Sequence, residues 1–478
     1  MALTALAVLA GSASGSQDAR SLADGLLIRP PVEAPGAPAG PVEARMTEAS
    51  IPGLAVAVLQ GGRVAWAGGW GRTRPDGPPV DARTPFQVAS LSKPVTAAAV
   101  LTLADEGLLD LDADVNTVVP GLARSPSGAA VDGVTPHRLL RHSAGVGTPG
   151  FPGTSGPLPE LDDVLDGRSP ATVPPIRVEA PPGDLTLYSG GGYVLLQRLV
   201  EAVVGRPFAE VVGERLLLPL GMADSDYADP EPGPGAEGRA AGHDRAGGPL
   251  PEAWRRYAED AAAGLWSTAA DMGRFLEGLH QAGAGADGPL PPAVAAEMGR
   301  PIPVRMAGGA PTWGAGWEIH GQGAATYLSI TGNNPGYRAR MVWFPATGDG
   351  VVVLTNADRG GPVIDDVVRG IAVRLAWPAL QPRRVAAGAV PEEALASVPG
   401  HYRFGPADLV IEVAVRDGAL ALKLPWSDFV ALRPVGDGRW VAADGADVTF
   451  GAVEDGQVRT ITVVPPGQAP LDGVREPG

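Results

Sequence analysis

The sequence predicts an α+β protein, in which an antiparallel sheet flanked by helices is followed by a small all-β domain. Two hairpin-like pairs of β-rich runs, at residues 54–67 and 337–355, stand at either end of a long region with helical patterns. This arrangement favours one antiparallel sheet that is covered by helices. After about residue 398 the pattern changes to short alternating strands separated by turns, which predicts a meander or barrel.

Composition fits a folded protein of more than one domain. The chain has 478 residues, of which 45% are hydrophobic and 19% are charged. Its formal net charge of −16, without any run of basic residues, argues against a nucleic-acid partner and against an anionic membrane surface. Because cysteine is absent, disulfides, thiolate catalysis and cysteine-based metal sites are excluded.

The N-terminal part, residues 1–41, is interpreted as a leader and an arm. An apolar run at residues 1–10 is followed by small residues at 11–15, as in a secretory signal, although the basic start of such a signal is missing. We therefore expect an extracytoplasmic protein, secreted or periplasmic. The run is too short to span a bilayer and no other stretch of about 18 apolar residues exists, so no integral membrane span is expected. Residues 28–41 are rich in Pro, Ala and Gly, which is typical of a solvated arm.

The first hairpin and the helix after it come next along the chain. The β-like runs 54–59 and 64–67 surround a Gly-Gly turn, which is a strong hairpin signal. The segment 94–103 is apolar on nearly all sides and is expected to be a central buried helix. Gly107 is expected to end this helix, because glycine adopts the left-handed conformation that often follows a helix.

Later elements alternate with long loops. Residues 194–204 carry a helical pattern that stops at Gly205. Loops rich in Gly and Pro occupy residues 147–182 and 228–251. Long loops inside a folded domain are commonly functional, so these two are expected to line a cleft. The second hairpin is followed by a helix-like run at residues 363–376.

Ser90 and Lys93 form the strongest candidate for chemistry. Only two of the 37 basic residues are lysines, Lys93 and Lys423. A lysine can lose its proton when desolvated, whereas an arginine stays protonated, so a lysine retained in this arginine-rich chain suits a general base. If Ser90 starts a helix, Lys93 lies one turn later on the same face, beside free backbone N–H groups that can stabilise an oxyanion. The alternative is a buried helix whose first turn carries these residues by chance.

Other chemistries lack their motifs. The six histidines are scattered and no His-Glu-x-x-His occurs, so no metal or other cofactor is expected. His137 and His142 have no third ligand nearby, and His142 is expected to satisfy buried backbone groups. The Gly-x-Ser-x-Gly elbow, the Walker loop and the dinucleotide fingerprint are all absent. The expected partner is a small-molecule or peptide substrate, and the oligomeric state is left open.

Several short motifs occur in an order that resembles the β-lactamase-related serine hydrolases. They are Phe86 to Lys93, His142 to Gly145, Pro182 to Ser189, Pro219 to Met222, Gly264 to Met272 and Gly332 to Gly336. This group includes class C β-lactamases, D-alanyl-D-alanine carboxypeptidases, D-aminopeptidases and family VIII esterases. The resemblance covers roughly residues 42–377 and implies a β-lactamase/transpeptidase-like sheet with a helical subdomain.

The resemblance also suggests how the chain is divided. The serine hydrolase domain is expected at residues 42–378, a linker at 379–397 and a β-barrel at 398–478. The last of these is similar to the lipocalin-like β-domain that follows the hydrolase domain in some members of the group.

The resemblance implies a role for each candidate residue. Ser90 would be acylated, Lys93 would act as the base or proton relay, and Tyr188 would be a second proton-transfer group that the nearby lysine makes more acidic. The alternative for Tyr188 is a core aromatic residue before a glycine turn. The oxyanion would be bound by the backbone N–H groups of Ser90 and Asn333. The predicted oxyanion-binding and substrate-binding residues of the later segment are Thr331, Gly332 and Asn333.

Two positions depart from the pattern of the group. Gly190 stands where an asparagine that would hold a substrate amide is common, and Ile330 stands where a lysine or histidine that would meet a substrate carboxylate is common. Arg338 or Arg340 is an alternative source of that cation. These departures favour small esters or neutral amides over penicillins and D-Ala-D-Ala peptides. A penicillin-binding carboxypeptidase, a β-lactamase, a D-aminopeptidase and a non-catalytic envelope binding protein stay open as alternatives.

Overall fold

The structure, a computed structural model, describes residues 26–33, 39–228, 238–302, 312–386, 388–405, 409–425, 429–436, 438–443, 445–465 and 470–476. The signal-like run at residues 1–15 lies outside them. The described chain falls into two compact units, one holding residues from 41 to 368 and the other holding the segment 27–40 and the residues after 368. Among the described residues, none of the helices is long and apolar enough to cross a membrane.

The first unit is built on a seven-stranded antiparallel sheet with the strand order β5-β4-β12-β11-β10-β9-β8. The strands are β4 (Gly53–Gln60), β5 (Arg63–Gly71), β8 (Thr312–Trp313), β9 (Glu318–His320), β10 (Tyr327–Asn334), β11 (Tyr337–Phe344) and β12 (Asp349–Thr355). Both predicted hairpins are present, and they meet because β4 pairs with β12. The predicted antiparallel sheet is therefore confirmed.

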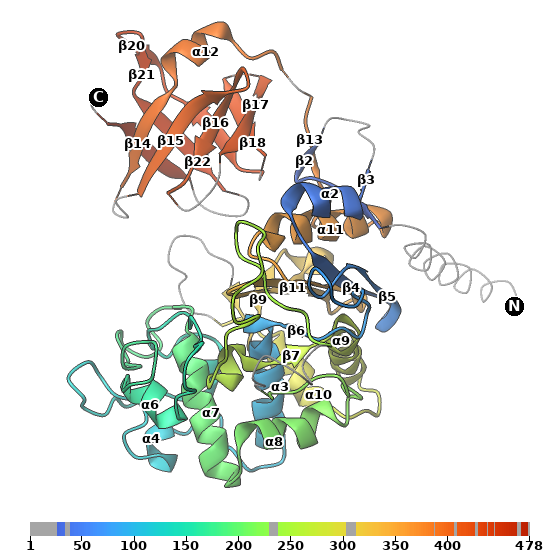
Figure 1. Ribbon diagram of the computed structural model, residues 1–478. Helices are drawn as coiled ribbons and strands as arrows, with labels where there is room; N and C mark the ends of the chain where they lie inside the picture. The colour runs from blue at the N-terminus through green and yellow to red at the C-terminus, as the bar shows by residue number, and fades with distance from the viewer. Residues whose placement is uncertain are drawn as a thin grey trace, which may run out of the picture. The chain divides into compact units, whose positions relative to one another are not determined.

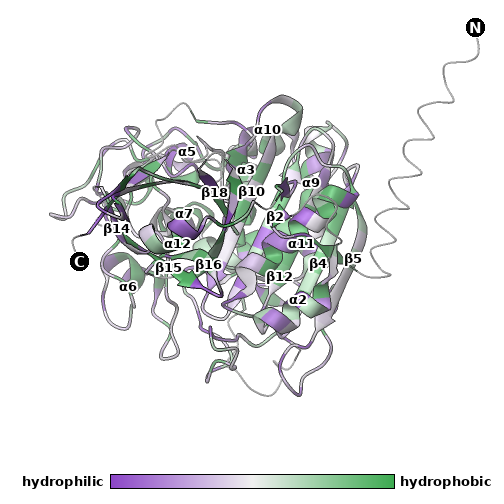
Figure 2. Ribbon diagram, turned by 90° about the horizontal axis from the view of Figure 1, so that it is seen from above, coloured by the Kyte–Doolittle hydropathy of each residue, from purple (hydrophilic) through white to green (hydrophobic). Residues whose placement is uncertain are grey.

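The central strands are apolar because both faces of the sheet are covered. β4 is buried from Gly53 to Leu59, and β12 is buried along nearly its whole length. Figure 2 labels these two strands side by side, with the edge strand β5 next to β4. A strand that is buried on both faces needs a continuous apolar run, since alternate side chains point to opposite sides.

Helices form the layers on the two faces of the sheet (Figure 1). α9 (Ala269–Gly283) packs against β4, β5 and β12 on one face. α2 (Val42–Ala49) and the part of α11 (Gly360–Arg374) that belongs to this unit cover the other face. An ion pair of 2.9 Å between Arg45 and Asp366 joins these two helices.

α3 (Ser92–Asp105) is the centre of the helical part, and it is buried from Ser92 to Leu103 as its apolar sequence predicts. It contacts α7, α10 and the short turns η2, η3 and η4. Gly107, at φ 70°, follows the helix in the left-handed conformation that was expected of it. The remaining helical elements of this unit are α4 (Val115–Val118), α5 (Pro136–Leu140), α6 (Leu161–Asp166), α7 (Gly190–Val204), α8 (Phe208–Val212), α10 (Pro292–Met298), η2 (Ala89–Leu91), η3 (Gly213–Leu217), η4 (Asp260–Gly264) and η6 (Gly323–Ala325) among the described residues.

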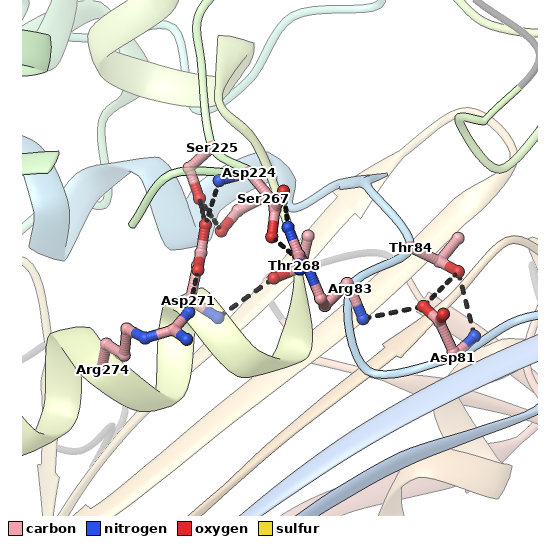
Figure 3. A network of polar contacts seen from close by, with 9 residues as sticks. All are labelled: Asp81, Arg83, Thr84, Asp224, Ser225, Ser267, Thr268, Asp271 and Arg274. Atoms are coloured by element: carbon pink, nitrogen blue, oxygen red, sulfur yellow. Dashed lines mark hydrogen bonds and ion pairs between the residues drawn. The ribbon is translucent and has the colours of Figure 1, made fainter. Parts of the chain in front are cut away.

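A buried polar network holds the start of α9 in place (Figure 3). Thr268 caps the helix by accepting the Asp271 N–H at 3.0 Å. The Asp271 side chain is fully buried and accepts from the Asp224 N–H and the Ser225 hydroxyl, both at 2.8 Å, and it also pairs with Arg274. The chain just before this cap is β7 (Trp266–Ser267), so the network fixes the strand that contacts the Ser90 segment.

The second unit contains a closed barrel of eight antiparallel strands in the order β14-β15-β16-β17-β18-β19-β22-β23. The strands are β14 (Gly400–Phe404), β15 (Leu409–Arg416), β16 (Ala419–Lys423), β17 (Val430–Gly436), β18 (Arg439–Ala442), β19 (Asp447–Phe450), β22 (Thr460–Val464) and β23 (Leu471–Arg475). Buried side chains such as Tyr402 and Trp440 form its core. The predicted all-β domain is thus a barrel, while its boundaries at residues 378 and 398 stay a prediction.

Candidate active site

Ser90 lies in the one-turn helix η2, immediately before α3, rather than at the start of the α-helix itself. The turn is possible because Ala89 adopts a left-handed conformation with φ 52°, which is rare for alanine. The Ser92 hydroxyl stabilises it by donating to the Ala89 carbonyl at 2.6 Å and accepting from the Leu265 N–H at 3.2 Å. Ser92 is therefore a buried structural residue, whereas Ser90 is partly exposed.

The segment before Ser90 is tied to two distant strands. β6 (Phe86–Gln87) pairs with β7, and the Val88 N–H donates to the Leu265 carbonyl at 3.1 Å. The Asn334 side-chain amide on β10 donates to the Gln87 side chain at 3.0 Å. Because these bonds come from separate parts of the first unit, they fix the turn that carries Ser90.

Lys93 lies one turn after Ser90 and is 1% exposed. Its Nζ donates to Ser90 Oγ at 3.0 Å and to the Ala262 carbonyl at 2.8 Å. Nζ also lies 5.0 Å from the ring centroid of Tyr188 and 5.6 Å from that of Tyr193. The predicted Ser90–Lys93 pair is therefore formed, in a buried pocket made of two rings and one carbonyl.

Tyr188 approaches Ser90 from a different segment. Its hydroxyl donates to Ser90 Oγ at 2.7 Å, and its side chain is partly exposed. Tyr193, in contrast, is fully buried, and burial raises the pKa of its phenol well above the ordinary value of 10.0. Tyr193 donates to the Leu140 carbonyl at 2.9 Å, which makes it a structural hydroxyl. Of the two tyrosines beside Lys93, Tyr188 alone contacts Ser90 among the described residues.

His142 supports the backbone next to Tyr188. Its Nδ1 accepts the Ser189 N–H at 3.1 Å, and its side chain is buried. This contact confirms the prediction that His142 satisfies a buried backbone group. The Ser189 hydroxyl in turn accepts the Gly192 N–H at 2.8 Å and caps α7. The helix thus begins at Gly190, earlier than the predicted start at residue 194.

The later segment runs beside the Ser90 turn on β10. A side chain at Gly332 would meet the Val88 carbonyl, with the Cβ at 2.3 Å from its oxygen, so only glycine permits this approach. Thr331 and Asn333 are exposed, whereas Gly332 lies on the buried side of the strand. Roles for these residues in binding an oxyanion or a substrate stay predictions.

The structure argues against an arginine replacing the cation missing at Ile330. Ile330 is 2% exposed and belongs to the main hydrophobic core. Arg338 is held by the Asn334 carbonyl and by Asp358, both at 2.9 Å, and Arg340 pairs with Asp365. Both guanidinium groups therefore already have protein partners.

Gly190, the other departure, is packed against an aromatic side chain. A Cβ at this position would lie 3.0 Å from the Phe151 ring and 3.1 Å from the Pro149 carbonyl oxygen. Phe151 is nearly buried. Even a Cβ at Gly190 would therefore be tight against Pro149 and Phe151, which pack against the start of α7.

The sequence analysis did not identify two features of this region, the Ala262 carbonyl and the buried Glu259. The Ala262 carbonyl that accepts from Lys93 is a backbone group, so no residue type in the sequence identifies it. Glu259 precedes η4, and its own carbonyl accepts the Ala262 and Ala263 N–H groups at 3.0 and 2.9 Å. Its side chain is 3% exposed, and burial raises the pKa of Glu259 to about 7, although its own backbone N–H and that of Ala258 act in the opposite direction.

Comparison with known proteins agrees with this geometry. Residues 40–373 match the beta-lactamase family. Penicillin-binding protein 4 of Amycolatopsis lactamdurans is 29% identical over 362 residues, which cover 70% of this chain and 88% of that protein. Esterase EstB of Burkholderia gladioli is 30% identical over 195 residues, which cover 39% of this chain and 50% of the esterase. The octameric penicillin-binding protein homologue from Pyrococcus abyssi shares the fold, with a TM-score of 0.61 at 22% identity over 90% of this chain and 98% of that one. The chain therefore belongs to the beta-lactamase family of serine hydrolases.

Proposed function

We propose that the protein hydrolyses small esters or neutral amides through an acyl-enzyme on Ser90. The observation that carries this proposal is the convergence of the Lys93 amine and the Tyr188 hydroxyl on Ser90 Oγ, at 3.0 and 2.7 Å. A partly exposed hydroxyl that meets a buried amine suits a nucleophile that is activated by a base.

In the acylation half of the proposed reaction, Ser90, Lys93 and Tyr188 each act once. Neutral Lys93 takes the proton of Ser90 as Oγ attacks the substrate carbonyl and forms the tetrahedral intermediate. Tyr188 then donates its proton to the leaving oxygen or nitrogen, and the acyl group stays on Ser90. In the second half the Tyr188 phenolate takes a proton from the water that attacks this ester. Protonated Lys93 then returns its proton to Ser90 Oγ as the acid product leaves, so all three groups are restored. The N–H groups of Ser90 and Asn333 are the proposed oxyanion donors.

The substrate preference follows from what surrounds the three groups. Ile330 is uncharged and buried in the core, and Arg338 and Arg340 are already ion-paired. None of these three residues therefore offers a free cation that could recognise a substrate carboxylate. Gly190 is buried and has no side chain, so this position offers no amide group to a substrate. A recognition hydrogen bond to a charged group contributes about 1.5–3 kcal/mol, so its loss disfavours anionic substrates by about 10- to 100-fold.

A substrate panel tests this preference. Purified protein is assayed with p-nitrophenyl acetate and butyrate, with nitrocefin, and with a peptide that ends in D-Ala-D-Ala, and the Ser90→Ala variant serves as the blank. We expect kcat/KM for the esters to exceed that for nitrocefin by at least about tenfold. Efficient opening of nitrocefin without release of nitrophenol would contradict the substrate assignment and favour a β-lactamase.

An extracytoplasmic location is part of the proposal. It is supported by the apolar run at residues 1–10 and by the penicillin-binding protein among the relatives.

A further inference from the structure

His142 occupies a backbone conformation that restricts which residues can replace it. It follows α5 with φ 58°, in the left-handed region where Asn, Asp and His are enriched among non-glycine residues. Its side chain is 2% exposed. A buried, polar residue in this conformation is costly, so a specific contact is expected to explain it.

One such contact is the bond from the Ser189 N–H to His142 Nδ1, at 3.1 Å. Because Nδ1 accepts this bond, the proton of the neutral ring lies on Nε2. Burial lowers the pKa of His142 well below its ordinary value. The ring therefore stays neutral and keeps its acceptor aimed at the residue that follows Tyr188.

The second contact is with the tyrosine ring itself. The His142 ring centroid lies 4.7 Å from that of Tyr188 and 4.5 Å from that of Trp313, and the Trp313 and Tyr188 centroids are 5.4 Å apart. These three rings form one packed group. The His142 ring centroid also lies 5.4 Å from that of Tyr193.

We propose that His142 is a positioning residue for Tyr188. It holds the backbone through Ser189 and the phenol ring through a tilted ring contact, and both restraints act on the bond from the Tyr188 hydroxyl to Ser90 Oγ. This inference rests on the proposed function, in which Tyr188 transfers a proton. A displacement of this hydroxyl by about 1 Å is expected to lower the rate about 100-fold.

The test is a double-mutant cycle with Tyr188→Phe and His142→Asn, measured as kcat and KM for p-nitrophenyl butyrate. Asn accepts the left-handed conformation and offers an oxygen near the place of Nδ1, but it lacks the ring. We expect Tyr188→Phe to lower kcat about 100-fold or more, and His142→Asn to lower it about 10- to 100-fold with KM changed less than about twofold. In the Tyr188→Phe background, His142→Asn is expected to change kcat by less than about twofold, since the hydroxyl it positions is already absent.

The control is His243→Asn, because His243 is a second buried histidine, 1% exposed, whose Nδ1 contacts the Asn356 carbonyl at 3.0 Å. Its effect on kcat is expected to be small and the same in both backgrounds. His142→Gly, which also suits φ 58°, repeats the cycle if the Asn variant does not fold.

An equal loss of kcat from the His142 variants with and without the Tyr188 hydroxyl would overturn the inference and leave His142 a general structural residue. Wild-type kcat in Tyr188→Phe would instead refute the proposed role of Tyr188, and the positioning role with it.

Discussion

Lys93→Arg is expected to lower kcat/KM for p-nitrophenyl butyrate by about 10³-fold, the scale of a lost general base. The arginine keeps the positive charge and much of the length of the side chain, but a guanidinium does not lose its proton in proteins. It also cannot present the single nitrogen that meets both Ser90 Oγ and the Ala262 carbonyl. Steady-state kinetics at several pH values, with circular dichroism to establish folding, provide the measurement.

Lys423→Arg is the matched control, because Lys423 is the only other lysine of the chain. It ends β16 of the barrel, and its Nζ lies 5.5 Å from the Phe429 ring centroid, a contact that an arginine can also make. Its kcat/KM is expected to equal that of the wild type. A Lys93→Arg variant that keeps wild-type kcat/KM would show that a fixed charge suffices at this position, and the base would have to be sought elsewhere.

Glu259→Gln is expected to increase the free energy of unfolding by roughly 3 kcal/mol at pH 8.5 and by much less near pH 5. Burial raises the pKa of Glu259 in the folded protein from its ordinary value of 4.5 to about 7. Below pH 4.5 the carboxyl is protonated in both the folded and the unfolded state, so its ionisation does not change the free energy of unfolding. As the pH rises to 7, the unfolded chain releases the proton while the folded chain retains it, so stability falls and stays lower above pH 7.

Glutamine resembles the protonated acid and does not ionise, so the stability of the variant does not fall in this way as the pH rises. Urea unfolding of both proteins at pH 5, 7 and 8.5 measures the difference. Glu160→Gln serves as the control, since Glu160 is exposed. A difference between wild type and Glu259→Gln that does not change with pH would mean that the carboxyl titrates normally in the folded protein.

The fold was predictable where its signals are local. The Gly61-Gly62 turn and the all-round apolar pattern of α3 each depend on neighbouring residues, and both are present as predicted. Two barrel strands, β14 and β23, were not predicted. β23 has the sequence Leu-Asp-Gly-Val-Arg, without the alternation of a half-buried strand. It is a strand because it closes the barrel by pairing with β14, about 70 residues earlier in the chain, as in Tyr402 with Arg475.

The residues of the site were likewise predictable from local sequence only in part. Ser90 and Lys93 were predicted together because their spacing of three residues is a local property. Tyr188 was assigned by resemblance, since nothing in the local sequence places it beside Ser90. The Ala262 carbonyl and the ring of Trp313 could not be predicted, because a backbone oxygen has no residue type and an aromatic residue in a short strand is common in any hydrophobic core. Their places depend on tertiary packing.

The most direct measurement of the central claim is the intact mass of the protein after treatment with a fluorophosphonate. We expect the wild type to gain the mass of one phosphonyl group, which fragmentation assigns to Ser90, and we expect Ser90→Ala to gain none. Ser92→Ala is expected to remain reactive, because Ser92 is fully buried and both of its bonds are structural. An unmodified wild type, or equal labelling of Ser90→Ala, would contradict an acyl-transfer site built on Ser90.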